Sequence, residues 1–129
     1  SVDRLALADE LQKHLLRNNR NLPVFVQVNI SGEASKGGFR PEETPDVVRE
    51  LGRRAPLLRI EGLMTLAPEA GDVRPHFRGL RELGGRCGVR GLSMGMSRDF
   101  EVAIEEGATV VRIGSALYES AETRGLPAG

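Results

Sequence analysis

The sequence is poor in several features that define large functional classes. Its 129 residues include one cysteine and no tryptophan, and aromatic residues make up 4%. The single cysteine, Cys87, excludes an internal disulfide and favours a reducing, cytoplasmic setting. So few aromatic side chains leave little for stacking nucleic-acid bases. The formal net charge of +0 gives no reason to expect nucleic acid or an anionic membrane as a partner.

Lysines, histidines and long apolar runs are also scarce. Only Lys13 and Lys36 among the 18 basic residues are lysines, so any lysine chemistry has two candidates. His14 and His76 lie far apart in helical patterns without the spacing of metal ligands, and no metal site is predicted. No apolar run approaches the roughly 20 residues that span a bilayer. The chain begins at Ser1, already leading into a helix, and we expect a further segment upstream.

Helical and strand patterns alternate along the chain. Helical spacing of apolar residues is found at about 3–18, 44–54, 72–87 and 97–107, and strand patterns at 22–30, 57–66, 91–96 and 109–114. This order predicts parallel βαβ units, either in a doubly wound open sheet or in a (β/α)8 barrel. Polar inward positions such as Gln27, Asn29 and Arg112 favour the barrel, because an open sheet needs two apolar faces. Four strands make half of a barrel, so we predict that residues 1–129 form a single-domain fragment.

The strand at 91–97, GLSMGMS, has two unequal faces. Its bulky face carries Leu92, Met94 and Met96, and its bare face carries Ser93, Gly95 and Ser97. A face of serine and glycine lets something large approach the backbone. The pattern therefore predicts a ligand or a close packing partner beside this strand.

Residues near this bare face are suited to an anion. Arg112 offers only donors, and Gly114 and Ser115 follow it with backbone N–H groups and a hydroxyl. Ser97 is expected to cap the helix that follows, where free N–H groups and the helix dipole favour negative charge. Barrels often bind phosphate with the loops after strands 7 and 8. The plainer alternatives are an ordinary N-cap for Ser97 and a surface ion pair for Arg112.

Other candidate motifs give weaker support for a functional site. The segment SGEASKGGF at 31–39 lacks the residue order of a phosphate-binding P-loop, and Lys36 within it is expected to be a solvated lysine. Cys87 completes an apolar helical stripe and is expected in the core rather than as a nucleophile.

Several segments resemble a known family. VNISGEASKGGF, EGLMTLAP, LSMGMSRDFEVAIEEGATVVRIGSALY and the opening SVDR are similar to segments of the pyridoxal-phosphate homeostasis proteins, and the resemblance extends to about Tyr118. It implies the fold of the alanine racemase N-terminal domain, a single (β/α)8 barrel. It also implies binding of pyridoxal 5′-phosphate (PLP) by a carrier or buffer without established catalysis.

The resemblance also implies roles for particular residues. Arg112 matches the arginine that faces the pyridine nitrogen of PLP, and Ser97, Gly114 and Ser115 match the phosphate cradle. The remaining candidate contacts with the cofactor are Ser93, Gly95, Met96, Asn29 and Met64. The family's Schiff-base lysine lies on the first barrel strand, which would precede Ser1, and Lys36 does not match it. The chain thus resembles about strands 4–8, the C-terminal half of the barrel.

Three functions remain open from the sequence. The first is a PLP-binding homeostasis protein that is not an enzyme. The second is an amino-acid racemase of the related fold, which needs a paired lysine and tyrosine, although the sole tyrosine here is Tyr118. The third is a phosphate-binding module for another metabolite. The sequence gives no oligomeric state.

Overall fold

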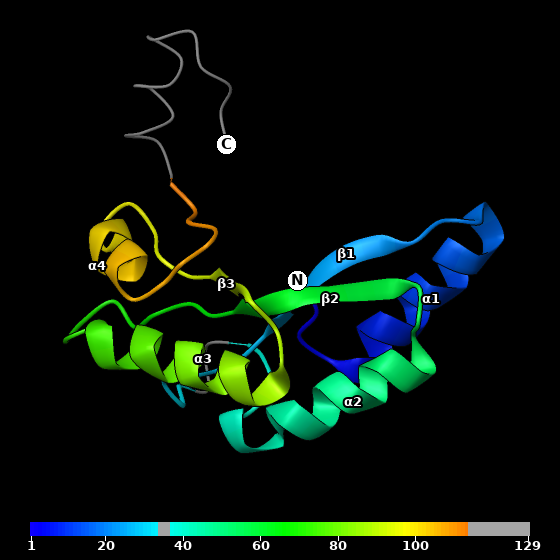
Figure 1. Cartoon of the computed structure of the whole chain (residues 1–129), viewed down its shortest axis with the longest axis horizontal. Coiled ribbons are helices and arrows are strands. Elements are labelled where there is room, and N and C mark those ends of the chain that lie inside the picture. The colour runs from blue at the N-terminus through cyan, green and yellow to red at the C-terminus, as the bar shows by residue number, and fades with distance from the viewer. Residues whose placement is uncertain (34–36, 114–129) are drawn as a thin grey trace, which may run out of the picture.

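Helices and strands alternate along the chain, as the sequence predicts. The structure is a computed structural model, and it describes residues 1–33 and 37–113. Its helices are α1 (Leu5–Asn18), α2 (Thr44–Arg54), α3 (Arg74–Cys87) and α4 (Phe100–Glu105), with a 3-10 helix η1 (Pro41–Glu43) before α2 (Figure 1). Its strands are β1 (Leu22–Gln27), β2 (Leu58–Met64) and β3 (Gly91–Ser93).

The three strands form one parallel sheet in the order β1-β2-β3. Parallel bridges extend the pairing on both sides, from Val2 to Val26 of β1 and from Ser93 of β3 to Val110. The carboxyl ends of all these segments therefore meet at one edge of the sheet. The predicted α/β class is confirmed. The strand expected at 109–114 is present only as the bridge at Val110, and its last residue, Gly114, lies outside the described residues.

The core lies between the sheet and the helices on one of its faces (Figure 1). Val26 of β1, Leu51 of α2 and Leu80 of α3 are fully buried there. Each such side chain stabilises the fold by roughly 1.5–3 kcal/mol relative to leaving it exposed. Phe25 and Gln27 alternate with the core residues of β1 and are only partly buried. In Figure 1 no helix of the described residues lies above β1.

A β-bulge in β2 decides which side chains face the helices. Val24 pairs with Ile60 and Phe25 pairs with Gly62, so Glu61 has no partner in the register. The extra residue shifts the alternation of side chains after it. Met64 is consequently buried but lies outside the core cluster on the helix side.

Two glycines let β2 and β3 approach. A Cβ atom on Gly62 would lie 2.0 Å from the carbonyl oxygen of Gly91, and one on Gly91 would lie 2.7 Å from the carbonyl oxygen of Glu61. Both contacts are with backbone, which cannot move aside without separating the strands. The pairing of β2 with β3 therefore requires glycine at both positions.

Helix α4 ends as the sequence predicts, with Gly107 directly after the C-cap. Gly107 has a φ of +103°, and its N–H donates to the carbonyl of Ile104 at 3.1 Å. The N–H of Ala108 donates to the carbonyl of Ala103 at 2.9 Å. These two bonds form a Schellman motif, which turns the chain from α4 back toward the sheet.

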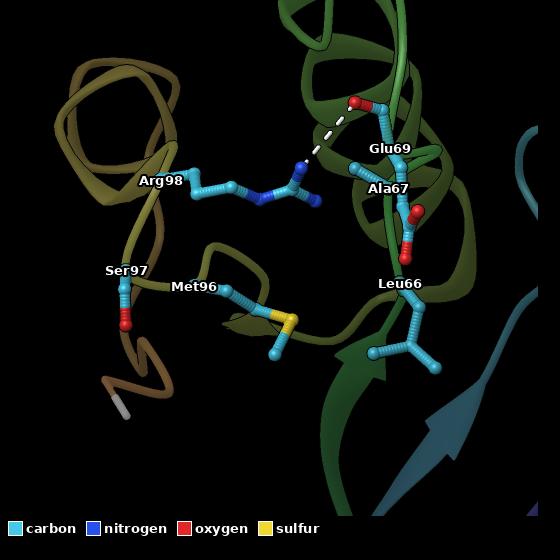
Figure 2. Close-up of a pocket in the computed structure, with 6 residues that line it drawn as sticks. All are labelled: Leu66, Ala67, Glu69, Met96, Ser97 and Arg98. Carbon is cyan, nitrogen blue, oxygen red and sulfur yellow. Dashed lines mark hydrogen bonds between the residues drawn. The ribbon is translucent and has the colours of Figure 1, made fainter. Parts of the chain in front are cut away.

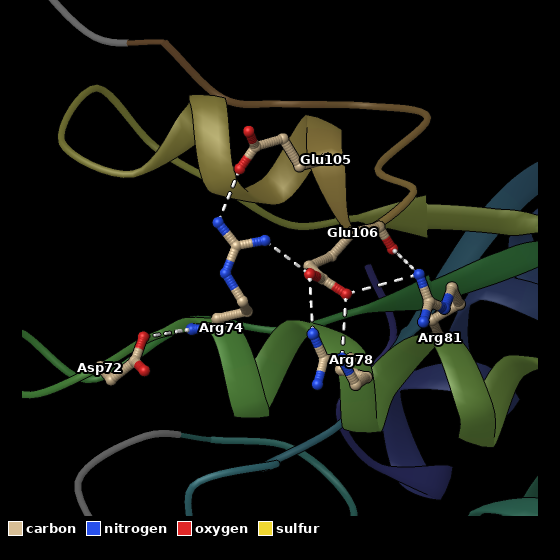
Figure 3. Close-up of polar contacts among 6 residues, drawn as sticks. All are labelled: Asp72, Arg74, Arg78, Arg81, Glu105 and Glu106. Atoms are coloured by element: carbon tan, nitrogen blue, oxygen red, sulfur yellow. Dashed lines mark hydrogen bonds and ion pairs between the residues drawn. The ribbon is translucent and has the colours of Figure 1, made fainter.

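A buried carboxylate joins α3 to the end of α4 (Figure 3). The side chain of Glu106, 6% exposed, contacts Arg74 at 2.7 Å, Arg78 at 3.3 Å and Arg81 at 3.4 Å. We call these four residues the Glu106 clamp. Hydrogen bonds from Arg78 and Arg74 hold the pKa of the Glu106 carboxyl below its usual range.

We expect Gly62→Ala to lower the free energy of unfolding by at least about 1–3 kcal/mol, the usual cost of overpacking. The matched control is Gly52→Ala in α2, where a Cβ atom meets nothing within 4 Å. That control should raise stability by about 0.5–1 kcal/mol, because alanine suits a helix interior better than glycine. Urea denaturation measures both. Equal effects of the two substitutions would contradict the close approach of β2 and β3.

We expect Glu106→Gln to destabilise the fold in a pH-dependent way. Because the folded pKa of Glu106 is lowered, its carboxylate contributes stability above the ordinary glutamate range, and the contribution is lost as pH falls through the folded pKa. The difference in stability between the parent and Glu106→Gln should therefore be full at neutral pH and shrink in acid. Glu105→Gln, at a side chain 62% exposed, should cost less at neutral pH. Thermal melts across pH measure this, and a difference independent of pH would refute it.

Candidate functional site

The predicted site residues of three neighbouring segments meet at the carboxyl edge of the sheet. Met64 ends β2, Ser93 ends β3, and Asn29 lies just beyond the end of β1. Hydrogen bonds between neighbouring segments continue at this edge, from the Val28 N–H to Met64 O at 2.8 Å and from the Thr65 N–H to Ser93 O at 3.1 Å. Ligands of parallel α/β proteins bind at this edge.

A pocket of about 390 Å³ opens between the loops that follow β2 and β3 (Figure 2). Its lining residues are Leu66, Ala67, Glu69, Met96, Ser97 and Arg98. The Arg98 guanidinium donates to the Glu69 carbonyl at 3.4 Å and so joins the two loops. In Figure 2 the Ser97 hydroxyl points away from this guanidinium. The volume lies in the range of sites for small molecules, about 300–1,000 Å³.

The N-cap position of the helix after the pocket is held by a residue that the sequence analysis did not single out. Asp99 is the N-cap of α4, and its Oδ1 accepts from the Met96 N–H at 2.7 Å, while its own N–H donates to Met96 O at 3.0 Å. The prediction of Ser97 as the N-cap is therefore wrong, and Ser97 lies within the turn that Asp99 closes. The Asp99 carboxylate makes no bond to the first turn of α4 and instead closes the turn 96–99 that precedes the helix.

The two-faced strand expected at 91–97 ends early. Met94 is fully buried whereas Met96 is 48% exposed, so the two do not share a face as expected. Between them Gly95 has a φ of +101°, and a Cβ atom there would lie 2.5 Å from Cβ of Ala103. The bare position at Gly95 thus admits helix α4, a close packing partner rather than a ligand on that side.

Arg112 is tied by its backbone to the strand before the pocket. Its N–H donates to Gly95 O at 2.9 Å, and Val110, two residues earlier, forms a parallel bridge with Ser93. Partial burial lowers the pKa of the Arg112 guanidinium. Within residues 1–33 and 37–113 it forms no ion pair, so the surface ion pair considered as an alternative is absent there. By accessible surface Arg112 is exposed, so its guanidinium, which offers only donors, is open to an anionic or acceptor-rich ligand.

The other candidates differ in how directly they could meet a ligand. Asn29 holds its own loop, donating from Nδ2 to Glu33 O at 2.7 Å and accepting at Oδ1 from the Gly32 N–H at 3.1 Å. Ser93 and Met64 are almost fully buried. Gly114, Ser115, Lys36 and Tyr118 lie outside the described residues.

Other chemistries find little support in the structure. Cys87 packs partly buried against the core, where burial raises the pKa of its thiol, as expected of a structural cysteine. Among the described residues no group of histidine, cysteine and acidic side chains could hold a metal ion. No helix in that part of the chain is long and apolar enough to cross a membrane.

Sequence reasoning missed the outer wall of the pocket. Leu66, Ala67 and Arg98 line it, and none of them stood out in the sequence as a candidate. The segment LMTLAP at 63–68 does not show where the strand ends or which side chains face the pocket. The bulge at Glu61, earlier in the strand, shifts the alternation of side chains. The position of Arg98 depends on the turn closed by Asp99.

Solved structures with the same arrangement of elements include PipY of Synechococcus elongatus with PLP bound. It covers 88% of this chain and 56% of its own, with a TM-score of 0.77 and 28% identity. An alanine racemase of Clostridium difficile covers 91% of this chain and 32% of its own, with a TM-score of 0.69. At 21% identity it shows the shared fold alone.

The curated relatives of this chain include pyridoxal phosphate homeostasis proteins from bacteria and mammals. Pyridoxal phosphate homeostasis proteins of Aquifex aeolicus and of human are 47% and 38% identical to this chain, each over 92% of it. The matches take up 55% and 48% of those proteins, so the chain spans about half their length. Residues 1–122 match the family described as the alanine racemase N-terminal domain. The chain belongs to this family, and the curated proteins it resembles within the family are pyridoxal phosphate homeostasis proteins.

Proposed function

We propose that this chain binds PLP at the carboxyl edge of its sheet, as part of a protein that stores or carries the cofactor inside the cell. The observation that carries the proposal is the pocket between the loops after β2 and β3, beside the segment that holds Arg112. The resemblance to PipY with PLP bound supports it, because that structure shares this arrangement over most of the chain.

The residues present fit the parts of PLP. Met96, Leu66 and Ala67 give the pocket an apolar wall against which a pyridine ring can pack. Ser97 offers a hydroxyl donor to the phosphate, and we assign Gly114 and Ser115 to the same cradle. Asn29 and Met64, at strand ends on the same edge, remain secondary candidates for contact with PLP. Ser93 is almost fully buried and Gly95 is packed against α4, so we assign neither a direct contact.

Arg112 fits the ring nitrogen, which is an acceptor when unprotonated. The guanidinium offers only donors and stays charged, so it favours the unprotonated nitrogen. Bound PLP supplies an aldehyde and an electron-withdrawing ring, and an arginine at the ring nitrogen weakens that withdrawal. A weaker electron sink suits storage of the cofactor better than strong carbanion chemistry, and the curated relatives are named as homeostasis proteins, so we propose a protein that is not an enzyme.

The same segment would form about strands 4–8 of a complete (β/α)8 barrel. Val2, β1, β2, β3 and Val110 give five adjacent parallel positions, which supports this numbering. The uncovered face of β1 then becomes barrel interior, and residues 1–129 the C-terminal half of one domain. The cytoplasm suits such a carrier and a chain with one cysteine.

Two substitutions separate the phosphate site from the ring site. In the complete protein, Ser97→Ala should lower the affinity for PLP by about tenfold or more, since a hydrogen bond to a charged group is worth about 1.5–3 kcal/mol. It should leave binding of pyridoxal, which lacks the phosphate, nearly unchanged. Arg112→Ala should lower the affinity for both PLP and pyridoxal. Absorbance titration measures both affinities, with Arg90→Ala, at an exposed arginine before β3, as the control.

Two outcomes would count against the proposal. Unchanged PLP affinity in both Ser97→Ala and Arg112→Ala would place the cofactor elsewhere. Incubating the same PLP-loaded protein with L-alanine should give no D-alanine, and racemisation would show that the protein is an enzyme.

A further inference from the structure

The Glu106 clamp fixes both the side chain and the backbone of one residue. Its three arginines occupy successive turns of α3, at positions 74, 78 and 81, and they approach both carboxylate oxygens of Glu106 (Figure 3). Arg81 also donates to the main-chain carbonyl of Glu106 at 3.4 Å. The end of α4 is therefore held against α3 by charge as well as by packing.

The chain is tied at almost every step from Glu106 to Arg112. Gly107 and Ala108 close the Schellman motif. Thr109 bonds to both polar groups of Leu92, accepting at Oγ1 from its N–H at 2.9 Å and donating its own N–H to its carbonyl at 2.9 Å. Arg112 then donates to Gly95 O. No step in this series is a free loop that could absorb a shift of α4.

The clamp is also well placed to set the pocket. Helix α4 begins at the turn that carries Met96, Ser97 and Arg98, and Ala103 of α4 packs into the space beside Gly95. The turn is also held to the loop after β2 by the bond from Arg98 to Glu69 O. A movement of the end of α4 would therefore shift the attachment of Arg112 more than the turn that carries Ser97.

We propose that Glu106 is a positioning residue for the ligand, acting through the placement of Arg112. The proposal rests on the proposed function, because it assumes that Arg112 meets the ring of PLP. The Glu106 clamp fixes the end of α4, and the hydrogen-bonded segment 107–112 that follows then determines where the Arg112 guanidinium lies. Glu105 shares Arg74 with Glu106, at 2.6 Å, but is exposed and does not reach Arg78 or Arg81 within hydrogen-bond distance.

A double-mutant cycle in the complete protein tests this. Glu106→Gln should weaken PLP by about tenfold, or about 1.4 kcal/mol, at a temperature where melts show the variant folded. The affinity for pyridoxal should fall by a similar factor, because Glu106 acts on the contact between Arg112 and the ring, which both compounds share. Glu105→Gln should change either affinity less than about twofold, a factor that corresponds to under about 0.5 kcal/mol. In an Arg112→Ala background, Glu106→Gln should have little further effect, the sign of coupled residues.

The contrary outcomes are distinct. If Glu106→Gln lowers the melting temperature but leaves PLP affinity unchanged, the clamp is structural only and the inference is wrong. If its effect is the same with and without Arg112, Glu106 does not act through that residue. Glu106→Asp, which keeps the charge and shortens the reach, replaces Glu106→Gln if the latter does not fold, with a smaller loss expected. Failure of the parent protein to bind PLP would instead overturn the proposed function.

Discussion

Parallel pairing of adjacent strands is the constraint on which the rest of the structure depends. Because β1, β2 and β3 run the same way, their carboxyl ends meet at one edge, and the loops that follow them must share it. The pairing of β2 with β3 requires two glycines face to face, Gly62 and Gly91, which sacrifice side-chain packing for close backbone approach. The pocket exists because two loops leave this edge side by side.

Electrostatics then fixes the elements that the sheet does not hold. Helix α4 has only six residues, too few to be stable by itself. The buried carboxylate of Glu106 fastens its end to three arginines of α3, and Asp99 closes the turn at its beginning. Charged side chains thus form contacts at both ends of α4, and the pocket wall formed by residues 96–98 lies directly before it.

The periodicity of apolar residues and the positions of turn residues were enough to predict the parallel α/β class. Alternating helix and strand patterns give the parallel α/β fold, and Gly107 marks the end of α4 as a C′ glycine should. The site was predicted less completely. Simple alternation places Met94 with Met96, but the positive φ of Gly95 breaks the strand between them. Ser97 and Asp99 both precede the helical pattern, and the sequence pattern alone does not choose between them as the N-cap. The Glu106 clamp joins residues 25 to 32 positions apart, and local patterns do not show such contacts.

The central claim is that PLP lies at the carboxyl edge of the sheet with its phosphate at the turn after β3. A crystal structure of the complete protein with PLP tests this most directly, because the phosphorus atom is located without assumptions about residue roles. The account predicts a phosphate oxygen within hydrogen-bond distance of Ser97 Oγ and the pyridine nitrogen facing the Arg112 guanidinium. A phosphate at the opposite edge of the sheet, near Leu16 and Leu57, would contradict it.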